Sequence, residues 1–357
     1  MEFDYNSFIK SGAIISIDEN KVLLGWGKSF WKHHKELDSK IPAFYFPDFF
    51  LYSTKPWIQY EFFLEISKEN LKTYFQKNNE VGACLIWENP YKKLFYNAFE
   101  QLQFEFSHSR LSKAVPYVFL NSKSQFLIDR LQHTLQSALN YSIRYPLVYL
   151  YGFWNEHSGM MGVTPELLFE YNENSKNSIL QTVALAGTCA NKGQDIKAFQ
   201  RDPKQLREHV FAVDGIKQSL MRFGKIKQEK MQVLELQTLS HLMTPIQVEL
   251  DDKVDFTTII HALHPTPALG AYPRIEGWEW LKEYNSQIDR GRYGAPAGIL
   301  YPGQSKARCL VAIRNVQWEL NEIRIGVGCG VIQESQCDQE WSEICLKIHA
   351  IQEILSL

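Results

Sequence analysis

The chain has 357 residues, of which 45% are apolar and 22% charged, and this composition is typical of a globular protein with a large core. Its 38 basic and 40 acidic side chains leave a formal net charge of −2, so no general positive field would attract nucleic acid or an anionic membrane. Six scattered cysteines without a CxxC pair argue against a zinc ribbon or a disulfide framework. We expect a cytoplasmic monomer or homodimer that binds neither nucleic acid nor membranes.

Membrane insertion and secretion are also unexpected. The longest apolar stretch, residues 145–154, is about half as long as a bilayer span requires. The chain begins with Glu2 and Asp4 before any apolar run, so the sequence predicts no signal peptide.

The first predicted elements lie in the middle of the chain. The first hundred or so residues are rich in aromatic side chains and follow no clear period. Leucines then recur at every fourth position between residues 124 and 142, which predicts an amphipathic helix. Residues 145–154 and 178–186 are predicted to be buried strands because they are short and rich in β-branched or aromatic side chains.

The later elements carry stronger local signals. Asp202 and Pro203 are typical of a helix start, and this helix should run to about Met221. Residues 316–320 alternate strictly and residues 323–332 follow after a turn, which predicts a hairpin. Ser335 and Asp338 resemble a capping box that opens a final helix. Because strands and helices follow one another in mixed order, we predict an α+β (complex α/β) fold.

Two predicted helices carry candidate metal ligands. Glu340, Glu343 and Lys347 recur at helical spacing beside the apolar face of the final helix. Two carboxylates on successive turns can share Mg²⁺, which prefers oxygen ligands, although a solvated helix edge is the commoner arrangement for such spacing. In the helix after Pro203, Glu208 is a further candidate ligand, and His209 is more often a hydrogen-bonded structural histidine.

Two other features could bind a carboxylate. Glycines alternate from residue 326 to residue 330, where bare backbone N–H groups would suit an anion. The stretch is not a dinucleotide motif, because it continues as strand where that motif needs a strand-to-helix turn. Arg314 could clamp a carboxylate with two parallel hydrogen bonds, or it could lie on the surface of an edge strand.

Ordered sequence blocks extend from Leu111 to Lys347, roughly two thirds of the chain. The blocks are LSKAV at 111–115, GVTPEL at 162–167, ALAGT at 184–188, DPKQLREH at 202–209, SHL at 240–242, HPTPA at 264–268, RGRYG at 290–294, AIR at 312–314, GVGCG at 326–330, and Ser335 with Glu340, Glu343 and Lys347. In identity and order they resemble the chorismate-utilising enzymes, the family of isochorismate, salicylate, anthranilate and aminodeoxychorismate synthases. The resemblance implies a large antiparallel β-sheet core with flanking helices, in which residues 106–357 form the chorismate-binding catalytic core and residues 1–105 a variable N-terminal part.

The resemblance also implies a role for each site residue. Lys113 would be the general base that activates water for attack at ring C2, and Glu166 the general acid that protonates the departing C4 hydroxyl. The acid role requires the pKa of Glu166 to rise from about 4.3 toward the working pH. Glu208, Glu340 and Glu343 would hold Mg²⁺ against the ring carboxylate of chorismate. The predicted substrate-binding residues are His241, Ala268, Tyr293, Arg314, Gly328, Gly330 and Lys347.

Three positions favour one branch of this family. Ala186 stands where aminodeoxychorismate synthases have a lysine nucleophile, and residues 264–269 differ from the PGGSITGAPK block of the ammonia-using members. Ala268 stands where the salicylate and ammonia-using relatives tend to have threonine. We therefore predict an isochorismate synthase, in which water is the nucleophile.

Other activities stay open at this point. The alternatives are a salicylate synthase, an ammonia-using anthranilate or aminodeoxychorismate synthase component, and a non-catalytic chorismate-binding module. The sequence does not distinguish menaquinone, siderophore and salicylate biosynthesis, and only analogy favours quinone biosynthesis.

Overall fold

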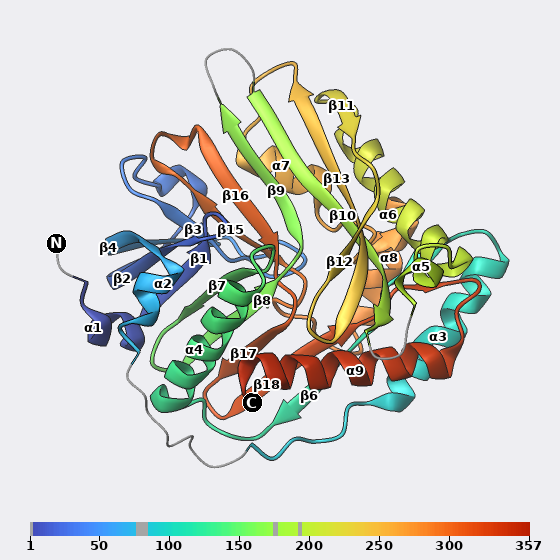
Figure 1. Ribbon diagram of the computed structural model, residues 1–357, viewed down its shortest axis with the longest axis horizontal. Coiled ribbons are helices and arrows are strands. Elements are labelled where there is room, and N and C mark those ends of the chain that lie inside the picture. Colours follow the sequence, from blue (N-terminus) through green and yellow to red (C-terminus); the bar gives the residue numbers. More distant parts are fainter. Residues whose placement is uncertain (1–2, 76–84, 174–177, 192–194) are drawn as a thin grey trace.

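The computed structural model describes residues 3–75, 85–173, 178–191 and 195–357. Over these residues, 16 strands join into one large sheet and three more form a small sheet, and all the pairings are antiparallel. Helices flank the large sheet (Figure 1). The predicted α+β fold, with a large antiparallel β-sheet core and flanking helices, is confirmed.

The strands differ widely in length. In chain order they are β1 (Gly12–Ser16), β2 (Lys21–Lys32), β3 (Ala43–Tyr45), β4 (Trp57–Ser67), β5 (Lys113–Ala114), β6 (Tyr117–Ser122), β7 (Tyr149–Trp154), β8 (Ser158–Thr164), β9 (Leu167–Glu173), β10 (Ser178–Ala190), β11 (Gly224–Gln228), β12 (Gln232–Glu235), β13 (Leu239–Leu250), β14 (Ala271–Tyr272), β15 (Pro296–Leu300), β16 (Lys306–Val311), β17 (Asn315–Glu319), β18 (Glu322–Gly328) and β19 (Val331–Ile332).

The helices connect and cover these strands. They are α1 (Tyr5–Lys10), α2 (Lys68–Lys72), α3 (Lys92–Ser107), α4 (Ile128–Arg144), α5 (Ile196–Phe199), α6 (Pro203–Leu220), α7 (Phe256–Leu263), α8 (Arg274–Asn285) and α9 (Cys337–Leu355), with short 3-10 turns at His34–Glu36 and Pro302–Gln304.

The order of strands in the large sheet joins the N-terminal part to the rest of the chain. The sheet runs β11-β13-β10-β9-β16-β15-β3-β4-β2-β1-β7-β8-β17-β18-β6, and β12 also pairs with β13. Strands β1 to β4 therefore lie in the middle of the sheet, between β15 and β7. The predicted division after residue 105 does not coincide with an interruption of the sheet.

The large sheet folds back on itself around a compact core. Phe44 and Phe46, at and just after β3, share a buried cluster with Tyr151 and Phe153 of β7, although the two strands are not neighbours in the sheet. A second and larger core lies on the other side, under α4, α6 and α9. The two cores bury opposite faces of the same alternating strands, as expected when side chains alternate across a sheet.

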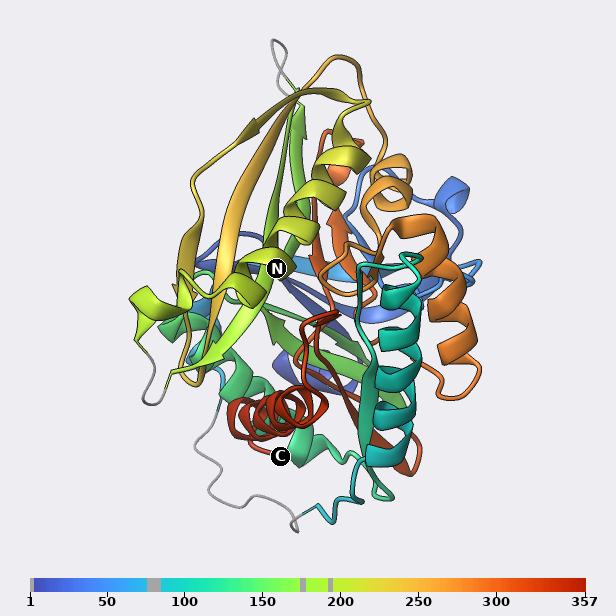
Figure 2. The same ribbon diagram turned by 90° about the vertical axis from the view of Figure 1, so that its right-hand side faces the viewer.

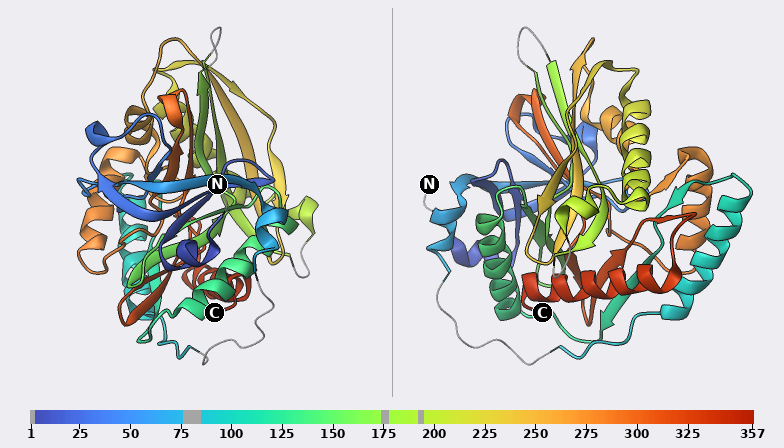
Figure 3. Two further views of the ribbon diagram at one scale, coloured as in Figure 1. Left: turned by 90° about the vertical axis from the view of Figure 1, so that its left-hand side faces the viewer. Right: turned by 45° about the vertical axis from the view of Figure 1, so that its right-hand side comes forward.

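Helices α6 and α9 frame the region where most of the sequence motifs lie. Helix α6 packs against β10 and β13, whereas α9 packs against α4, α3, β17 and β18. Figure 1 and the right-hand view of Figure 3 show α9 crossing one end of the molecule while α6 lies along the long strands. Helices α3 and α8 cover the side that faces the viewer in Figure 2. The small sheet, β14-β5-β19, brings Lys113 into this region.

Most predicted elements are present with shifted ends. The helix predicted over residues 124–142 is α4, and it buries Leu131, Leu135 and Leu139. The strand predicted over 145–154 begins at Tyr149, and the one predicted over 178–186 continues to Ala190. The predicted hairpin is β17 and β18, with the last segment separated as β19.

The two predicted helix starts have different outcomes. Asp202 caps α6 as predicted, because its side chain accepts a hydrogen bond from the Gln205 backbone N–H at 3.0 Å. The capping box at Ser335 is wrong: the N-cap of α9 is Gln336, and it makes no side-chain capping bond. The Ser335 hydroxyl instead accepts a hydrogen bond from the Ile332 backbone N–H at 3.2 Å.

Five cysteines lie among the described residues and all five are free thiols, while Cys84 lies outside that part of the chain. Of the helices in the described ranges, none combines the length and the apolar character that crossing a bilayer would need.

Candidate active site

One pocket, walled by α6, α9, β10, β13 and β18, gathers residues that are far apart in the sequence. Ten of the twelve predicted site residues line it: Glu166, Glu208, His241, Ala268, Tyr293, Arg314, Gly328, Gly330, Glu343 and Lys347. The other two, Lys113 and Glu340, do not line it and are bonded to Glu208 and Lys204 respectively. The residues are therefore brought together as the motifs suggest, and their individual roles stay predictions.

Glu166 is a buried carboxyl in the turn between β8 and β9. Its backbone is fixed at both ends, because its N–H donates to the Thr164 hydroxyl at 3.1 Å and its carbonyl accepts from the Val311 N–H at 3.0 Å. The residue is only 2% exposed, and burial raises the pKa of its carboxyl to about 7, against the opposing effect of the Lys113 charge. Glu166 can therefore hold or release a proton near neutral pH.

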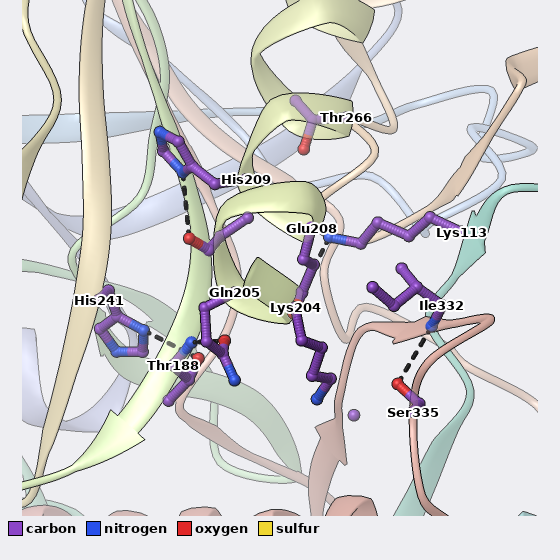
Figure 4. A network of polar contacts seen from close by, with 12 residues as sticks. Lys113, Thr188, Lys204, Gln205, Glu208, His209, His241, Thr266, Ile332 and Ser335 are labelled. Carbon is purple, nitrogen blue, oxygen red and sulfur yellow. Dashed lines mark hydrogen bonds and ion pairs between the residues drawn. The ribbon is translucent and has the colours of Figure 1, made fainter. Parts of the chain in front are cut away.

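Lys113 and Glu208 form a buried ion pair at one side of the pocket. Lys113 lies in the central strand of the small sheet, and its Nζ donates to Glu208 Oε1 at 3.0 Å (Figure 4). Burial alone would raise the pKa of Glu208, but the nearby charges of Lys113 and Lys204 outweigh it and hold the pKa below its ordinary value. Glu208 is therefore an ionised carboxylate within the protein.

Helix α9 turns an acidic edge toward the same region. Glu340 is only 1% exposed, so this edge is not the solvated face that spacing alone would favour. Glu340 is ion-paired with Lys204 of α6, and Glu343 is ion-paired with Lys347 at 2.7 Å one turn further along α9. Burial raises the pKa of the Glu340 carboxyl, and the nearby Glu343 carboxylate raises it further.

The three glutamates have the donor chemistry that Mg²⁺ prefers, although each now has a lysine partner. In the described part of the chain, no three His, Cys, Asp or Glu side chains are close enough together to form a metal cluster as they stand. The charges of Glu208 and Glu343 nevertheless both act on Glu340, so the three carboxylates share one neighbourhood. A Cβ at residue 330 would overlap Glu208 Oε1, so Gly330 leaves room for that oxygen. Carboxylates that exchange lysine for a cation would fit the predicted metal.

Arg314 enters the pocket from the junction of β16 and β17. Its backbone has φ 52°, in the left-handed region that non-glycine residues rarely adopt. Gly162 on the neighbouring strand leaves room for this backbone, because a Cβ there would collide with the Arg314 carbonyl oxygen. The alternative of a surface arginine on an edge strand is excluded, since Arg314 is partly buried in the pocket wall.

His241 is a neutral hydrogen-bond relay between Arg314 and Thr188. An Arg314 Nη2 lies 2.6 Å from His241 Nε2, and because guanidinium can only donate, Nε2 must be the acceptor. The proton is then on Nδ1, which faces the Thr188 hydroxyl at 3.2 Å (Figure 4). Burial, together with the charge of Arg314, lowers the pKa of His241 well below its ordinary value. His241 therefore positions Arg314 and does not carry a charge.

His209 is a structural histidine, as predicted. Its Nδ1–H donates to the Ala186 carbonyl at 3.1 Å, and its Nε2 accepts from the Thr244 hydroxyl at 2.7 Å. These two bonds tie α6 to β10 and β13, which fixes the helix that carries Glu208.

The enclosed part of the pocket is small, about 80 Å³, whereas sites for small molecules commonly have about 300–1,000 Å³. A wider cavity of about 640 Å³ adjoins it and shares Thr188, Leu239 and Glu343 as lining residues. The two spaces therefore adjoin beside Glu343 of α9. At this wall Lys347 is held by two contacts, the ion pair with Glu343 and a hydrogen bond that it donates to the Gly328 carbonyl at 3.0 Å.

Two residues of the site were present in the motifs without a predicted role. Lys204 neutralises the buried Glu340, and the Thr266 hydroxyl donates to Glu166 Oε1 at 3.4 Å. Thr266 thereby favours the ionised form of the general-acid candidate. Neither role could be inferred from spacing, because each partner comes from a distant part of the chain.

Known proteins resemble this chain in sequence and in fold. The sequence profile of the family described as "Chorismate binding enzyme" matches residues 59–356. A salicylate biosynthesis isochorismate synthase from Pseudomonas aeruginosa is 30% identical over 200 residues, which cover 55% of this chain and 42% of that protein. The chain spans about half the length of the curated relatives it matches.

Solved structures share the fold. The menaquinone-specific isochorismate synthase MenF from Escherichia coli has a TM-score of 0.77 at 19% identity, over 99% of this chain and 92% of that one. A putative 2,3-dihydroxybenzoate-specific isochorismate synthase, DhbC from Bacillus anthracis, has a TM-score of 0.77 at 20% identity, over 98% of this chain and 97% of that one. The profile match covers most of the chain and its motifs meet in one pocket, so this chain belongs to the family of chorismate-binding enzymes.

Proposed function

We propose that this chain is a Mg²⁺-dependent isochorismate synthase, which converts chorismate into isochorismate with water as the nucleophile. The observation that carries the proposal is the buried Glu166 carboxyl, whose pKa is raised to about 7 by burial. A carboxylic acid that is partly protonated at neutral pH can protonate a departing hydroxyl. Lys113, which would be the general base, is close enough for its charge to act on Glu166.

The proposed reaction is an allylic displacement. In the proposed step Lys113, after it has given its ammonium proton to solvent, accepts a proton from a water molecule as the water oxygen bonds to ring C2, the ring double bond shifts, and the C4–O bond breaks. Glu166 gives its proton to the departing hydroxyl, which leaves as water. One proton thus passes from Glu166 to the water that leaves and another from the attacking water to Lys113, and exchange with solvent restores both groups. Lys113 becomes available for this step when Glu208 takes another partner.

The basic groups in the pocket suit a substrate with two carboxylates. Arg314 and Lys347 supply positive charge, and the N–H groups around Gly328 and Gly330 supply uncharged donors. Glu208, Glu340 and Glu343 would hold Mg²⁺, which would supply charge that binds and orients the ring carboxylate of chorismate. The pocket therefore contains complementary groups at both ends of the proposed substrate.

Two alanines favour water as the nucleophile. Ala186 and Ala268 both line the pocket, so neither a lysine nucleophile nor a threonine hydroxyl is present at those positions. By analogy with the named relatives, we extend the proposal to menaquinone or siderophore biosynthesis.

The proposal is tested by identifying the product. Purified protein is incubated with chorismate in the absence of ammonia, with Mg²⁺ or with EDTA, and the products are separated by chromatography and weighed by mass spectrometry. We expect isochorismate with Mg²⁺ and none with EDTA. Salicylate with pyruvate would replace the proposal by a salicylate synthase, an aminated product formed on adding ammonia would indicate an ammonia-using synthase, and the absence of any product would indicate a binding module.

A pair of variants on helix α9 tests whether Glu340 binds the metal. Glu340→Gln should reproduce the EDTA result with an unchanged circular dichroism spectrum, because it removes a proposed ligand. Glu353→Gln on the same helix is exposed and should behave as the parent protein.

Substitution of His241 distinguishes a positioning role from direct contact with the leaving group. His241→Phe removes the acceptor that holds Arg314, so we expect the KM for chorismate to rise about tenfold, with a smaller change in kcat. His241→Gln retains an acceptor oxygen and should restore much of the affinity. Steady-state kinetics check this, with the exposed His157→Phe as the control. A fall in kcat at constant KM would instead place His241 at the departing hydroxyl.

A further inference from the structure

A second cavity of about 480 Å³ lies outside the candidate active site. Its walls are the end of β2, the turn between β7 and β8, the hairpin of β17 and β18, and the loop that follows α8. This volume is in the range of sites for small molecules and exceeds the enclosed space of the active-site pocket. No sequence motif predicted it.

Arg292 is the first of two arginines in this cavity. Its guanidinium lies against the rings of Phe153 and Trp31, at 5.1 and 5.9 Å from their centroids, and its Nε donates weakly to the Phe46 carbonyl at 3.4 Å. Burial lowers the pKa of Arg292, but an arginine stays charged at neutral pH. Among the ion pairs of the described residues, none includes Arg292. A partly buried cation with spare donors is a ready anion partner.

Arg324 of β18 is the second arginine. It lies 4.7 Å from the Phe119 ring centroid, and its Nη1 donates to the Asp289 carbonyl at 3.2 Å. A Cβ at residue 291 would overlap Arg324 Nη2, so Gly291, with φ 56°, is what allows this arginine to lie against the loop. Arg324 also has no carboxylate at ion-pair distance within the described ranges.

The rim of the cavity selects the kind of anion. Asp289, Glu319 and Glu322 line it and are exposed, whereas the two arginines are partly buried. Negative charge at the rim opposes a multiply charged anion such as phosphate more than it opposes a single carboxylate. Trp31 and Phe153 also line the cavity, and Arg292 lies against both rings.

We propose that this cavity binds a small aromatic monocarboxylate, with its carboxylate on Arg292 and Arg324 and its ring beside Trp31 and Phe153. The proposal does not depend on the reaction proposed above, because it concerns binding at a separate site.

The backbone connects this cavity to the candidate active site. Arg292 lines the cavity and the next residue, Tyr293, lines the active-site pocket. The Arg292 N–H donates to Gln317 Oε1 at 3.2 Å, which ties the loop to β17. On β18, Gly326 lies two residues after Arg324, and a Cβ there would collide with the Tyr293 ring. A ligand that moves Arg292 or Arg324 therefore acts on the residues that hold Tyr293.

Isothermal titration calorimetry of the full chain at low salt tests the proposal, with benzoate as the probe, benzamide as its uncharged counterpart and inorganic phosphate as the alternative anion. We expect benzoate to bind, and benzamide and phosphate to bind at least tenfold more weakly, because benzamide lacks the charge and phosphate faces the acidic rim. Equal binding of benzamide or phosphate, or no heat with benzoate, would overturn the proposal.

Variants locate the binding. Arg292→Gln and Arg324→Gln should each weaken benzoate binding about tenfold or more, and Ser158→Phe should abolish it by filling the cavity without removing a charge. Arg110→Gln is the matched control, because this arginine has a side chain that is 60% exposed and lies outside the cavity. Lys347→Gln, in the active-site pocket, should leave the benzoate affinity unchanged. If benzoate binding is lost in Lys347→Gln and kept in the other variants, the ligand is in the active site and the proposal fails.

Discussion

Replacement of Glu166 by glutamine is expected to lower kcat by about 10²- to 10⁴-fold, the range that a positioned general acid contributes. Glutamine retains the shape of the side chain but has no proton to give to the departing hydroxyl. Substrate affinity should change little, because the proposed carboxylate contacts lie on Arg314 and Lys347. Steady-state kinetics with chorismate measure both quantities, with the exposed Glu156→Gln as the matched control.

The pH dependence provides a second test of the same residue. Because the pKa of Glu166 is raised to about 7, turnover by the parent protein should fall as the pH rises above 7 and the acid form is lost. Two results would remove Glu166 from the acid role. One is a kcat of Glu166→Gln that falls less than about 10²-fold. The other is a parent pH profile that stays flat from pH 6 to pH 9.

Replacement of Glu166 should affect folding stability in the opposite sense to turnover. The folded-state pKa lies above the unfolded value of about 4.5, so the folded protein binds more protons between these values and stability falls as the pH rises through this window. Above pH 7 the cost of ionising the buried carboxyl is fully present. Glu166→Gln removes it, and we expect a gain of about 2–3 kcal/mol in the free energy of unfolding at pH 8 and almost none at pH 4. Denaturant unfolding at the two pH values measures this difference.

Lys113→Met is expected to abolish most turnover and also to destabilise the protein. Its side chain is fully buried and paired with Glu208, so truncation of one partner leaves a buried carboxylate without its cation. Breaking such a pair commonly costs about 3–5 kcal/mol. Loss of the general base should lower kcat by about 10²- to 10⁴-fold.

A double variant separates these two effects. Lys113→Met combined with Glu208→Gln removes both charges and should recover much of the stability without recovering turnover. Lys123→Met, at a side chain that is 86% exposed, is the control for loss of a lysine. Retention of turnover in well-folded Lys113→Met would show that Lys113 is not the base.

The parts of the fold that could be predicted from sequence are those fixed by nearby residues. Asp202 and Pro203 start α6 because the capping bond spans only three residues. The same reasoning fails at Ser335, whose hydroxyl is already used by the Ile332 backbone. A capping motif is a local preference, and a competing bond from the preceding strand can take its donor or acceptor.

In the candidate site, too, local features could be predicted from the sequence and contacts between distant residues could not. The motifs identify the residues that meet in the pocket, but not the partners that set their ionisation. Each predicted metal ligand is paired with a lysine, and in two of the three pairs the lysine comes from a different element: Lys113 with Glu208 and Lys204 with Glu340. The carbonyl of Arg314 likewise needs the space that Gly162 leaves on another strand. Such features arise from the pairing of distant segments, so they cannot be predicted from any short stretch of the sequence.

The central position of β1 to β4 has a consequence for how the chain is made and shortened. These strands leave the ribosome first, yet their outer neighbours, β7 on one side and β15 on the other, follow about 80 and 230 residues later. The middle of the sheet therefore has at least one open edge until β15 has been synthesised. Since the family match begins only at residue 59, an expression clone cut at that boundary would keep every active-site residue and most of β4 but lose β1, β2 and β3, which help to join the two halves of the sheet.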